Sequence, residues 1–219
     1  MIPPAYDLRR CHWSEVERLC EKYHPYKSAN AGAVYSFGVF EDGRIVAGYL
    51  WQPPTRGGAT STCPEAPHGV LSLSRMVAVP KAERTLNHVS KPLRRQMKLL
   101  IDRGRWPVLV TYSDEGQGHK GHAYKCSGWT PTTRSKAPTY TDDDGRRTSL
   151  YSNGDKKERG LTRGPDTTIQ RWEHWICDRG DAAEYMKERG WRRERRPGVT
   201  WWSGNPAYRY TQQQDLFAE

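Results

Sequence analysis

The sequence predicts an α+β protein in which helices flank a central mixed, mostly antiparallel sheet. Two segments, residues 7–26 and 87–104, carry apolar residues at helical spacing. Residues 33–54 and 70–80 alternate as strands do, and residues 106–114 form a nearly continuous apolar run. The resulting order of helix, hairpin, strand, helix, strand and short helix is typical of an α+β plan.

The first helix and the hairpin carry clear local signals. Ser14 is a good N-cap, and Glu17 stands three residues later, at capping-box spacing. The apolar stripe of this helix comprises Val16, Leu19, Cys20 and Tyr23. The next segment breaks at Glu-Asp-Gly, which is typical of a β-hairpin. Residues 53–69 are rich in Gly, Pro and Thr, so we expect a loop there.

A strand, a helix and a second strand follow. In residues 70–80 one face is expected to carry Leu71, Leu73 and Arg75, and the other Ser72, Ser74 and Met76. Because Pro92 is tolerated only in a first turn, the helix is expected to start near residues 87–91 and to end at Gly104. Its buried face comprises Leu93, Met97, Leu100 and Ile101. After the buried strand 106–114, a short helix or turn ends at Gly128.

The last third of the chain is polar and loop-like. We expect short strands around Tyr140 and Leu150, and a helix from Asp178 or Asp181 to Gly190. Residues 198–204 and 207–213 are expected to be closing strands. We assign residues 1–150 to a catalytic core and 151–219 to a basic, Trp-rich C-terminal part that packs on it, as one domain overall.

Composition points to a polyanionic partner. The 219 residues carry a net charge of +10, and only 35% are hydrophobic, although 9 Trp and 12 Tyr can each bury a large area. A basic surface favours nucleic acid, although basic residues also serve solubility. We find no membrane span and no signal peptide. The 5 Cys include no CxxC pair. We therefore expect a cytoplasmic protein without a membrane partner, and the sequence leaves open a monomer or a homodimer.

Asp114 is the leading catalytic candidate. A carboxylate at the end of an apolar strand suits a general base, although Asp is also a common turn residue. His119, His122 and Tyr124 follow within ten residues and can move protons; each alone is also an ordinary structural residue. His24 is an isolated candidate between the first helix and the hairpin.

Other residues suit ligands rather than proton transfer. Arg75 lies inside a strand, where its charge requires a partner, either an anionic ligand or Asp114. Near the start of the second long helix, phosphate donors or plain caps are expected at Asn87 and Ser90. A two-His, one-carboxylate set for non-haem iron is conceivable at His24, Asp114 and His119, although the sequence has no compact ligand spacing.

Two basic runs are candidate DNA contacts. The second long helix carries Lys91, Arg94, Arg95 and Lys98 on its predicted outer face. Near the C-terminus, arginines alternate with tryptophans, and the candidates there are Arg192, Arg193, Arg195 and Arg196. The plainer interpretation is a solvated helix with tryptophans in the core.

The order of elements is that of the GNAT acyltransferase fold, in which the strands at 70–80 and 106–114 splay apart. Over residues 20–130, the segments "HPY", "FGVFEDGRIVAGYLW", "LSLSRMVAVP", "NHVS" and above all "SDEGQGHKGHAYKCSGW" resemble the Mom-type DNA-modification proteins of bacteriophages. That family is similar in fold to the acyltransferases. It modifies the exocyclic N6 amine of adenine in phage DNA to an acetamido form, which protects the DNA from host restriction enzymes.

The resemblance implies a double-stranded DNA substrate, a location in the cytoplasm of the infected bacterial host, and a set of site residues. The catalytic residues would be Asp114, His24, Tyr124 and Arg75. Substrate or donor would be bound by Asn87, Ser90 and His119. We add Ser74, Ser113 and Trp129 as further candidates for the same role. Asp114, or His24 through water, would accept the N6 proton, Tyr124 would protonate the leaving group, and Trp129 or a C-terminal tryptophan would stack on a flipped adenine.

The group donor does not follow from the sequence. Acetyl-coenzyme A is the donor of the wider fold class, but the segment between Val79 and Asn87 lacks the glycines of its pyrophosphate loop. Two alternatives stay open at this point. One is an acyltransferase of the same fold that acts on a small amine or a protein. The other is a non-catalytic DNA-binding protein on a GNAT scaffold.

Overall fold

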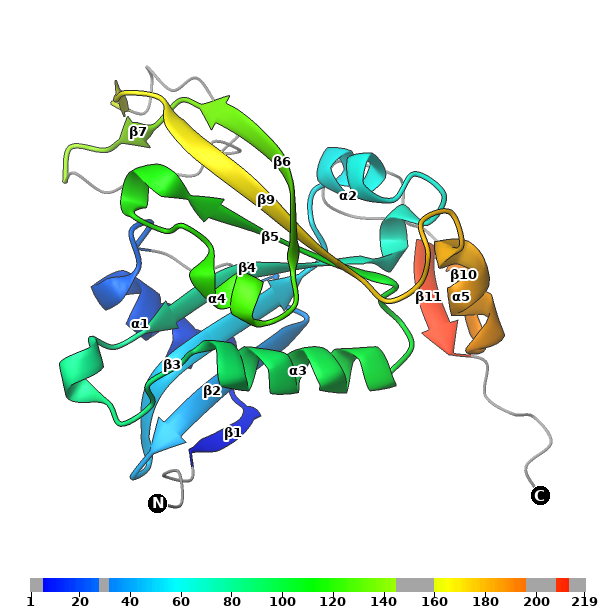
Figure 1. The fold of residues 1–219 in the computed structure, drawn as a ribbon, viewed down its shortest axis with the longest axis horizontal. Helices are drawn as coiled ribbons and strands as arrows, with labels where there is room; N and C mark the ends of the chain where they lie inside the picture. Colours follow the sequence, from blue (N-terminus) through cyan, green and yellow to red (C-terminus); the bar gives the residue numbers. More distant parts are fainter. Residues whose placement is uncertain (1–5, 28–31, 145–159, 196–207, 213–219) are drawn as a thin grey trace.

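A seven-stranded sheet organises the chain (Figure 1). The computed structural model describes residues 6–27, 32–144, 160–195 and 208–212, without the side chains of 193–195 and 208–212. In spatial order the strands are β1 (Asp7–Arg10), β2 (Tyr35–Glu41), β3 (Arg44–Gln52), β4 (Val70–Ala78), β5 (Val108–Asp114), β9 (Thr167–Trp175) and β6 (Thr130–Ala137). Neighbours pair antiparallel except β4 and β5, which are parallel.

Helices cover both faces of this sheet. They are α1 (Trp13–Tyr23), α2 (Arg56–Thr62), α3 (Ser90–Asp102), α4 (His122–Cys126) and α5 (Ala182–Glu188). Two small ribbons complete the described residues: β7 (Tyr140–Thr141) with β8 (Thr162–Arg163), and β10 (Trp191–Arg195) with β11 (Tyr208–Gln212). Among the described helices, none is long and apolar enough to cross a membrane.

Each face of the sheet is tied to its helices by particular side chains. On one face α1 packs so closely on β3 that a Cβ at Gly48 would lie 2.6 Å from a Val16 methyl group. On the other face Tyr49 donates a hydrogen bond to the Val89 carbonyl just before α3, at 2.9 Å. The buried Trp51 indole donates to a glutamine side chain of α3, also at 2.9 Å. These contacts fix α1 and α3 on opposite sides of β3.

The parallel strands β4 and β5 part soon after they meet. Their ladder covers only residues 70–72 of β4 and 108–110 of β5. β4 continues to Ala78 and β5 to Asp114 without further pairing between them, so a gap widens toward their C-terminal ends. A side-chain bond from Thr111 Oγ1 to the Leu73 carbonyl, at 2.9 Å, closes its narrow end. This splay and the strand order confirm the expected GNAT architecture.

Several elements match the sequence-based expectations. These are the hairpin β2–β3, the strands β4 and β5, the helices α3 and α4, the helix α5 and the short strands β7 and β11. Gly104 and Gly190, the expected helix stops, have φ of +64° and +73°, values that glycine tolerates best. The expected strands around Leu150 and at 198–204 lie outside the described residues.

The start of the first helix differs from the prediction. The cap is His12 and not Ser14: its Nδ1 accepts from the Ser14 N–H at 3.4 Å, and Glu15 Oε2 accepts from the His12 N–H at 3.0 Å. An imidazole nitrogen can replace the usual hydroxyl acceptor, so the capping box lies two residues earlier than predicted. The loop expected at 53–69 also contains a helix, α2, which is capped by Thr55.

The C-terminal boundary of the core also differs from the prediction. Residues 167–175, which lack the alternation of a typical strand, form β9. This strand inserts between β5 and β6, so the core does not end at residue 150. Both β6 and β1, likewise unpredicted, are mostly exposed and show no period-two alternation of apolar residues. Their pairing partners in the folded sheet, rather than local apolar patterning, make them strands.

Candidate functional site

Asp114 ends β5 with its carboxylate buried and held from two directions. Oδ1 accepts a hydrogen bond from the Gly116 N–H at 3.0 Å and another from the Thr167 hydroxyl. The Gly116 N–H lies 3.1 Å from Thr167 Oγ1 as well. Since Thr167 is the first residue of β9, a distant strand fixes the orientation of the carboxylate. The residue is 8% exposed, so the position of its carboxylate is set before any substrate arrives.

The side chains of β5 alternate between the two faces of the sheet. Val108 and Val110 pack with α2 and α5, which places Asp114 on that same side by the period of two. Ser113 faces the other side, where its Oγ accepts from the Trp172 indole at 2.9 Å. Arg75 on β4 pairs with Leu50, the residue after Tyr49, so it lies on the face opposite to Tyr49 and faces α1. Asp114 and Arg75 thus share one face of the splayed strands.

A β-bulge in β4 lies beside the splay. Leu50 pairs with Arg75 and Trp51 with Leu73, so Ser74 is the extra residue of the bulged strand. Its hydroxyl donates to the Leu50 carbonyl at 3.1 Å, and its own carbonyl accepts from the Arg75 guanidinium at 2.8 Å. Ser74, expected to contact substrate or donor, therefore serves here to shape the strand and to position Arg75.

His24 lies with Arg75 around the ring of Tyr26. The imidazole stacks on Tyr26 at 5.6 Å between centroids, and the Arg75 guanidinium lies 5.4 Å from the same ring. Burial, followed by the positive charges of Arg75, His119 and Lys27, lowers the pKa of His24 to about 3. The imidazole is therefore neutral at physiological pH.

The hydrogen bond of His24 also decides which ring nitrogen carries the proton. Nδ1 accepts from the Tyr26 N–H at 3.2 Å, which leaves the proton of the neutral ring on Nε2. Nε2 is then a hydrogen-bond donor. Because of this tautomer and the low pKa, His24 is unsuited to the base role that the sequence left open for it.

Tyr124 occupies the opposite face of the splay. Its ring packs against Trp129 and Trp172, with centroids 6.0 Å apart in each case, and its hydroxyl bonds the Thr111 side chain. Burial raises the pKa of Tyr124, so the phenol keeps its proton and is available as a donor. Gly121, which precedes α4 with φ of +70°, lies directly against the Trp172 ring.

Trp129 is a core residue in this structure. It is 3% exposed, stacks on Trp51 at 6.3 Å, and donates from Nε1 to the Met97 sulfur at 3.1 Å. With one face on Trp51 and its edge on α3, the ring cannot stack on a base. Our assignment of Trp129 to substrate binding is therefore wrong, because its ring is buried in the core between Trp51 and α3.

The segment that leads into α3 does not fit the pyrophosphate of coenzyme A. Residues 79–89 contain no glycine, and the Glu41 carboxylate of the β2–β3 hairpin accepts from the Thr85 and Leu86 N–H groups at 2.8 and 2.6 Å. Arg84 Nε donates to the Val79 carbonyl at 2.9 Å. An anion of the protein itself therefore already occupies two amides of this loop, and an incoming pyrophosphate would be repelled by it.

The remaining predicted ligand residues border this region. Asn87 is exposed ahead of α3, and Ser90, the first residue of α3, accepts from the Ser127 hydroxyl through its carbonyl at 3.3 Å. His119 is exposed, and its N–H donates to the Asp114 carbonyl at 3.2 Å. The actual N-cap is Val89, so neither Asn87 nor Ser90 caps the helix.

The iron site conceived for His24, Asp114 and His119 is not assembled. Within the described part of the chain, no three His, Cys, Asp or Glu side chains lie close enough together to hold a metal ion. His24 accepts from the Tyr26 N–H through Nδ1, and Asp114 accepts from the Thr167 hydroxyl.

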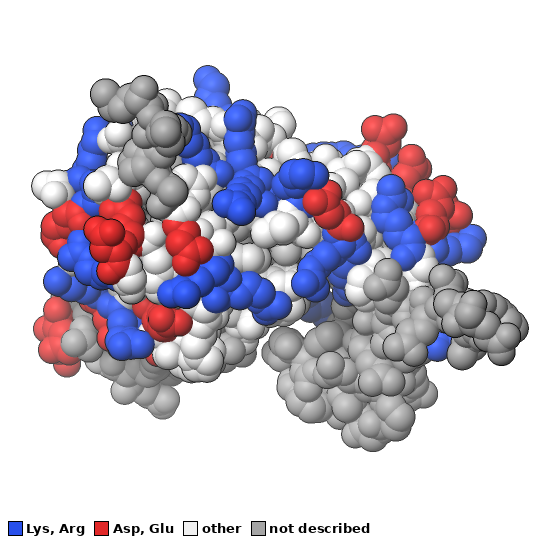
Figure 2. All heavy atoms as spheres, turned by 90° about the horizontal axis from the view of Figure 1, so that it is seen from below, with Lys and Arg blue, Asp and Glu red and all other residues white. Residues whose placement is uncertain are grey.

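The predicted basic face of α3 is exposed. Arg94, Arg95 and Lys98 project from it, and Figure 2, which views the molecule from below, shows Lys and Arg side chains crossing this side. Arg192 is exposed on β10, whereas Arg193 and Arg195 belong to β10 with side chains outside the description. Arg196 lies outside the described residues.

Sequence reasoning missed the residues that hold the site together. Thr167 fixes Asp114 from 53 residues away, and no local pattern marks it. Glu41 was interpreted only as part of a turn, yet it binds the loop before α3. Tyr26 had a usable signal, because an aromatic residue two positions after His24 can stack on it.

The chain is similar to known proteins in fold and, over most of its length, in sequence family. No curated protein matches the sequence. Similar solved structures include the ribosomal-protein-S18-alanine N-acetyltransferase from Escherichia coli, at 12% identity and TM-score 0.49, covering 80% of this chain and 98% of that one. An N-acetyltransferase from Staphylococcus aureus Mu50 has 11% identity and TM-score 0.49, with 79% and 99% covered. The model of the Mom protein family matches residues 5–171, and the chain therefore belongs to the Mom protein family.

Proposed function

We propose that this protein is a transferase that modifies the exocyclic N6 amine of adenine in double-stranded DNA, in an acetamido-type reaction that protects the DNA from restriction enzymes. The observation that carries the proposal is the buried Asp114 carboxylate at the open end of the splay, in a chain of the Mom family. The net charge of +10 is consistent with a DNA substrate.

The proposed catalytic residues lie on both faces of the sheet. Asp114 and Arg75 face the α1 and α2 side, and Tyr124 lies on the α3 and α4 side, so acceptor and donor would approach from opposite sides. The reacting atoms then meet in the gap between β4 and β5. A base inside a duplex cannot reach that gap, so the target adenine must be flipped out of the stack.

Asp114 and Tyr124 would carry out the two proton transfers of the reaction. Asp114 accepts one N6 proton as the nitrogen forms its bond to the carbon of the donor. The bond from that carbon to the leaving group breaks, and the leaving group takes a proton from Tyr124. Asp114 is the better base of the two candidates, because His24 has a pKa of about 3 and donates from Nε2. Positioning and electrostatics must supply much of the rate, since adenine N6 is a poor nucleophile.

Arg75 and His24 would bind the negative charge that develops during transfer. Arg75 is held by the Ser74 carbonyl and the Tyr26 ring, so it is oriented before substrate binds. The Nε2–H of His24 adds a neutral donor on the same side. Coenzyme A bound through its pyrophosphate is not the donor, since Glu41 occupies two amides of the loop before α3 where that pyrophosphate would bind. The donor is therefore a different molecule.

The test is nucleoside mass spectrometry on DNA from cells that express the wild type, Asp114→Asn or Glu115→Gln. Glu115 is a matched control, because it is the next carboxylate in the chain and forms an ion pair with the exposed Arg134 at 2.5 Å. We expect an adenine nucleoside of raised mass with the wild type and with Glu115→Gln. With Asp114→Asn its amount should fall about 10²–10⁴-fold.

The opposite result is equally clear. Unmodified adenine in all three samples, with each protein folded and expressed, would contradict the proposal. It would favour an acyltransferase for a small amine or a non-catalytic DNA-binding protein. Equal modification with Asp114→Asn would leave the reaction in place but remove Asp114 from it.

A further inference from the structure

Three arginines from two parts of the chain, β1 and the segment between α3 and β5, lie over aromatic rings at the end of β5 opposite to Asp114. The guanidinium carbons of Arg10 and Arg103 lie 5.3 and 5.5 Å from the centre of the Tyr35 ring. That of Arg105 lies 4.2 Å from Trp106, whose indole donates to the Tyr35 hydroxyl at 3.3 Å. We call Arg10, Arg103, Arg105, Tyr35 and Trp106 the arginine–aromatic patch.

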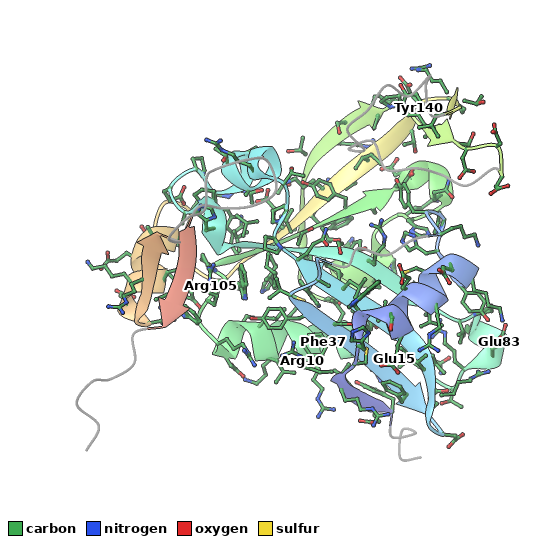
Figure 3. All side chains as sticks on the ribbon, turned by 180° about the vertical axis from the view of Figure 1, so that it is seen from behind. Arg10, Glu15, Phe37, Glu83, Arg105 and Tyr140 are labelled. Carbon is green, nitrogen blue, oxygen red and sulfur yellow. The ribbon has the colours of Figure 1, made fainter. Side chains whose placement is uncertain are left out.

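The C-terminal part of the chain docks on this patch. The Trp191 ring of β10 lies 5.6 Å from the Arg105 guanidinium, and its indole donates to the Arg103 carbonyl at 3.3 Å. The next residue, Arg192, is exposed. Figure 3 labels Arg10 near β1 and Arg105 near the β10–β11 ribbon, so the patch lies between these two elements.

Two arginines of the patch, Arg10 and Arg103, are not neutralised by carboxylates of the described residues. Neither Arg10 nor Arg103 forms an ion pair within the described residues, and both side chains are exposed. Arg10 makes a single backbone contact, to the Val34 carbonyl at 3.3 Å. An aromatic ring stacked under a guanidinium fixes the orientation of the guanidinium plane. The N–H groups at the edge of that plane stay available, which suits bidentate contact with phosphate.

The rings support the arginines and do not present a stacking surface of their own. Tyr35 is 9% exposed and Trp106 5% exposed. The groups that the patch exposes to solvent are therefore planar, positively charged guanidinium groups. Contacts of this kind bind a phosphate backbone and position it without reading base sequence.

We propose that the arginine–aromatic patch binds the backbone of duplex DNA to one side of the target base, as a contact separate from the Asp114 site. This inference rests on the proposed function. Arg105 precedes β5 and Asp114 ends it, and a strand of seven residues is about 20 Å long. Because the patch lies beyond the start of this strand and phosphates of one strand are spaced about 3.4 Å along the axis, the patch would meet the backbone at least about six nucleotides from the flipped base.

The experiment measures binding of a labelled 24-base-pair duplex to the full chain by fluorescence anisotropy, between about 50 and 200 mM salt. The test variant is Arg10→Gln with Arg103→Gln. The control is Arg9→Gln with Arg18→Gln, which removes the same charge. Arg9 adjoins Arg10 on β1 but pairs with Asp7 at 3.3 Å, and Arg18 lies on α1.

We expect the test variant to bind at least about fivefold more weakly, with a salt slope smaller by about two. The control should bind within about twofold of the wild type. Equal weakening in both variants would overturn the proposal, because charge alone would then explain it. Binding of the wild type to anionic phosphatidylglycerol vesicles but not to the duplex would also overturn it.

The two proposals fail in different ways. If cellular adenine is modified and the test variant binds DNA as the wild type does, the patch proposal is wrong and the proposed function stands. If no adenine is modified but the test variant binds more weakly with the smaller salt slope expected, the patch binds DNA and the proposed reaction is wrong.

Discussion

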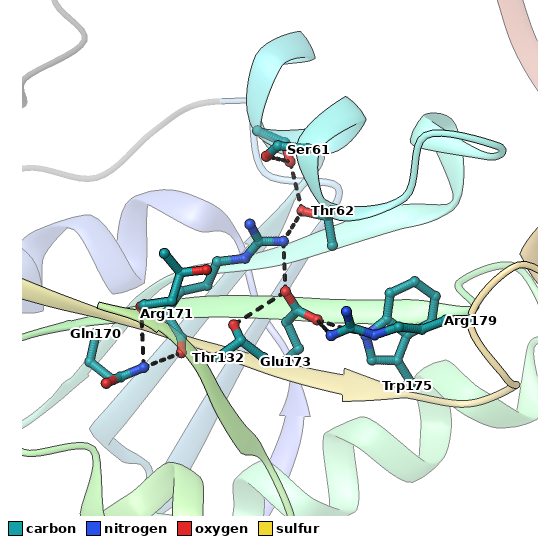
Figure 4. A network of polar contacts seen from close by, with 10 residues as sticks. Ser61, Thr62, Thr132, Gln170, Arg171, Glu173, Trp175 and Arg179 are labelled. Carbon is teal, nitrogen blue, oxygen red and sulfur yellow. Dashed lines mark hydrogen bonds and ion pairs between the residues drawn. The ribbon is translucent and has the colours of Figure 1, made fainter. Parts of the chain in front are cut away.

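Glu173 provides the sharpest test of the energetics of the sheet. Its carboxylate, 5% exposed, pairs with Arg171 at 2.7 Å and Arg179 at 2.6 Å, and accepts from the Trp175 indole at 2.7 Å (Figure 4). The Arg171 side chain is 12% exposed and reaches α2 through Thr62 at 2.6 Å. These contacts therefore connect β9 to α2.

Glu173→Gln removes the charge and keeps the volume. The change leaves Arg171 largely buried without its counter-charge, and breaking such a pair costs about 3–5 kcal/mol. Glutamine retains an acceptor for the Trp175 indole, so we expect the lower end, about 3 kcal/mol. For a chain of this length that corresponds to a fall in Tm of about 6–12 °C.

The assay is thermal and urea unfolding followed by circular dichroism. Arg179→Ala is the matched control, because the Arg179 side chain is 65% exposed and its pair is expected to contribute about 1 kcal/mol or less. Arg171→Met with Glu173→Leu should recover most of the loss, since it removes both buried charges. A cost below about 1 kcal/mol for Glu173→Gln would refute the reasoning, because Arg171 would then be solvated.

Three further predictions concern the site. Tyr124→Phe keeps the ring between its tryptophans, so it should cost only about 0.5–1.5 kcal/mol of stability in urea unfolding but reduce nucleoside modification about 10²–10⁴-fold; unchanged modification would exclude Tyr124 as the acid. The folded-state pKa of His24, about 3, lies below the ordinary 6.5, so the folded state binds fewer protons and stability should fall as pH drops below about 6.5. His24→Asn should flatten that part of a pH series of urea midpoints, and an unchanged slope would contradict the assignment. Gly121→Ala places a Cβ 2.1 Å from the Trp172 ring at φ of +70°, so it should lower stability by more than about 2 kcal/mol in the same unfolding assay, and a neutral result would show that the α4 turn relaxes freely.

The sequence by itself determined the elements that have local signals. Alternating residues and the Glu-Asp-Gly turn predict β2 and β3, and helical spacing with Gly104 behind it predicts α3. The apolar run before Asp114 predicts both β5 and the position of the candidate base at its end. These features depend on neighbouring residues, so a local pattern contains them.

Only the tertiary structure decided how the site is assembled. The apolar residues of β9, Ile169, Trp172 and Trp175, recur at every third position and not every second, so no strand pattern marks it. Its place between β5 and β6 supplies Thr167 to Asp114 from 53 residues away. His24 is a neutral donor because the fold buries it beside Arg75 of β4, and Trp129 is a core residue because it packs on Trp51. Pairing, burial and the fields of distant charges depend on residues that are far apart in the chain, and no local pattern records them.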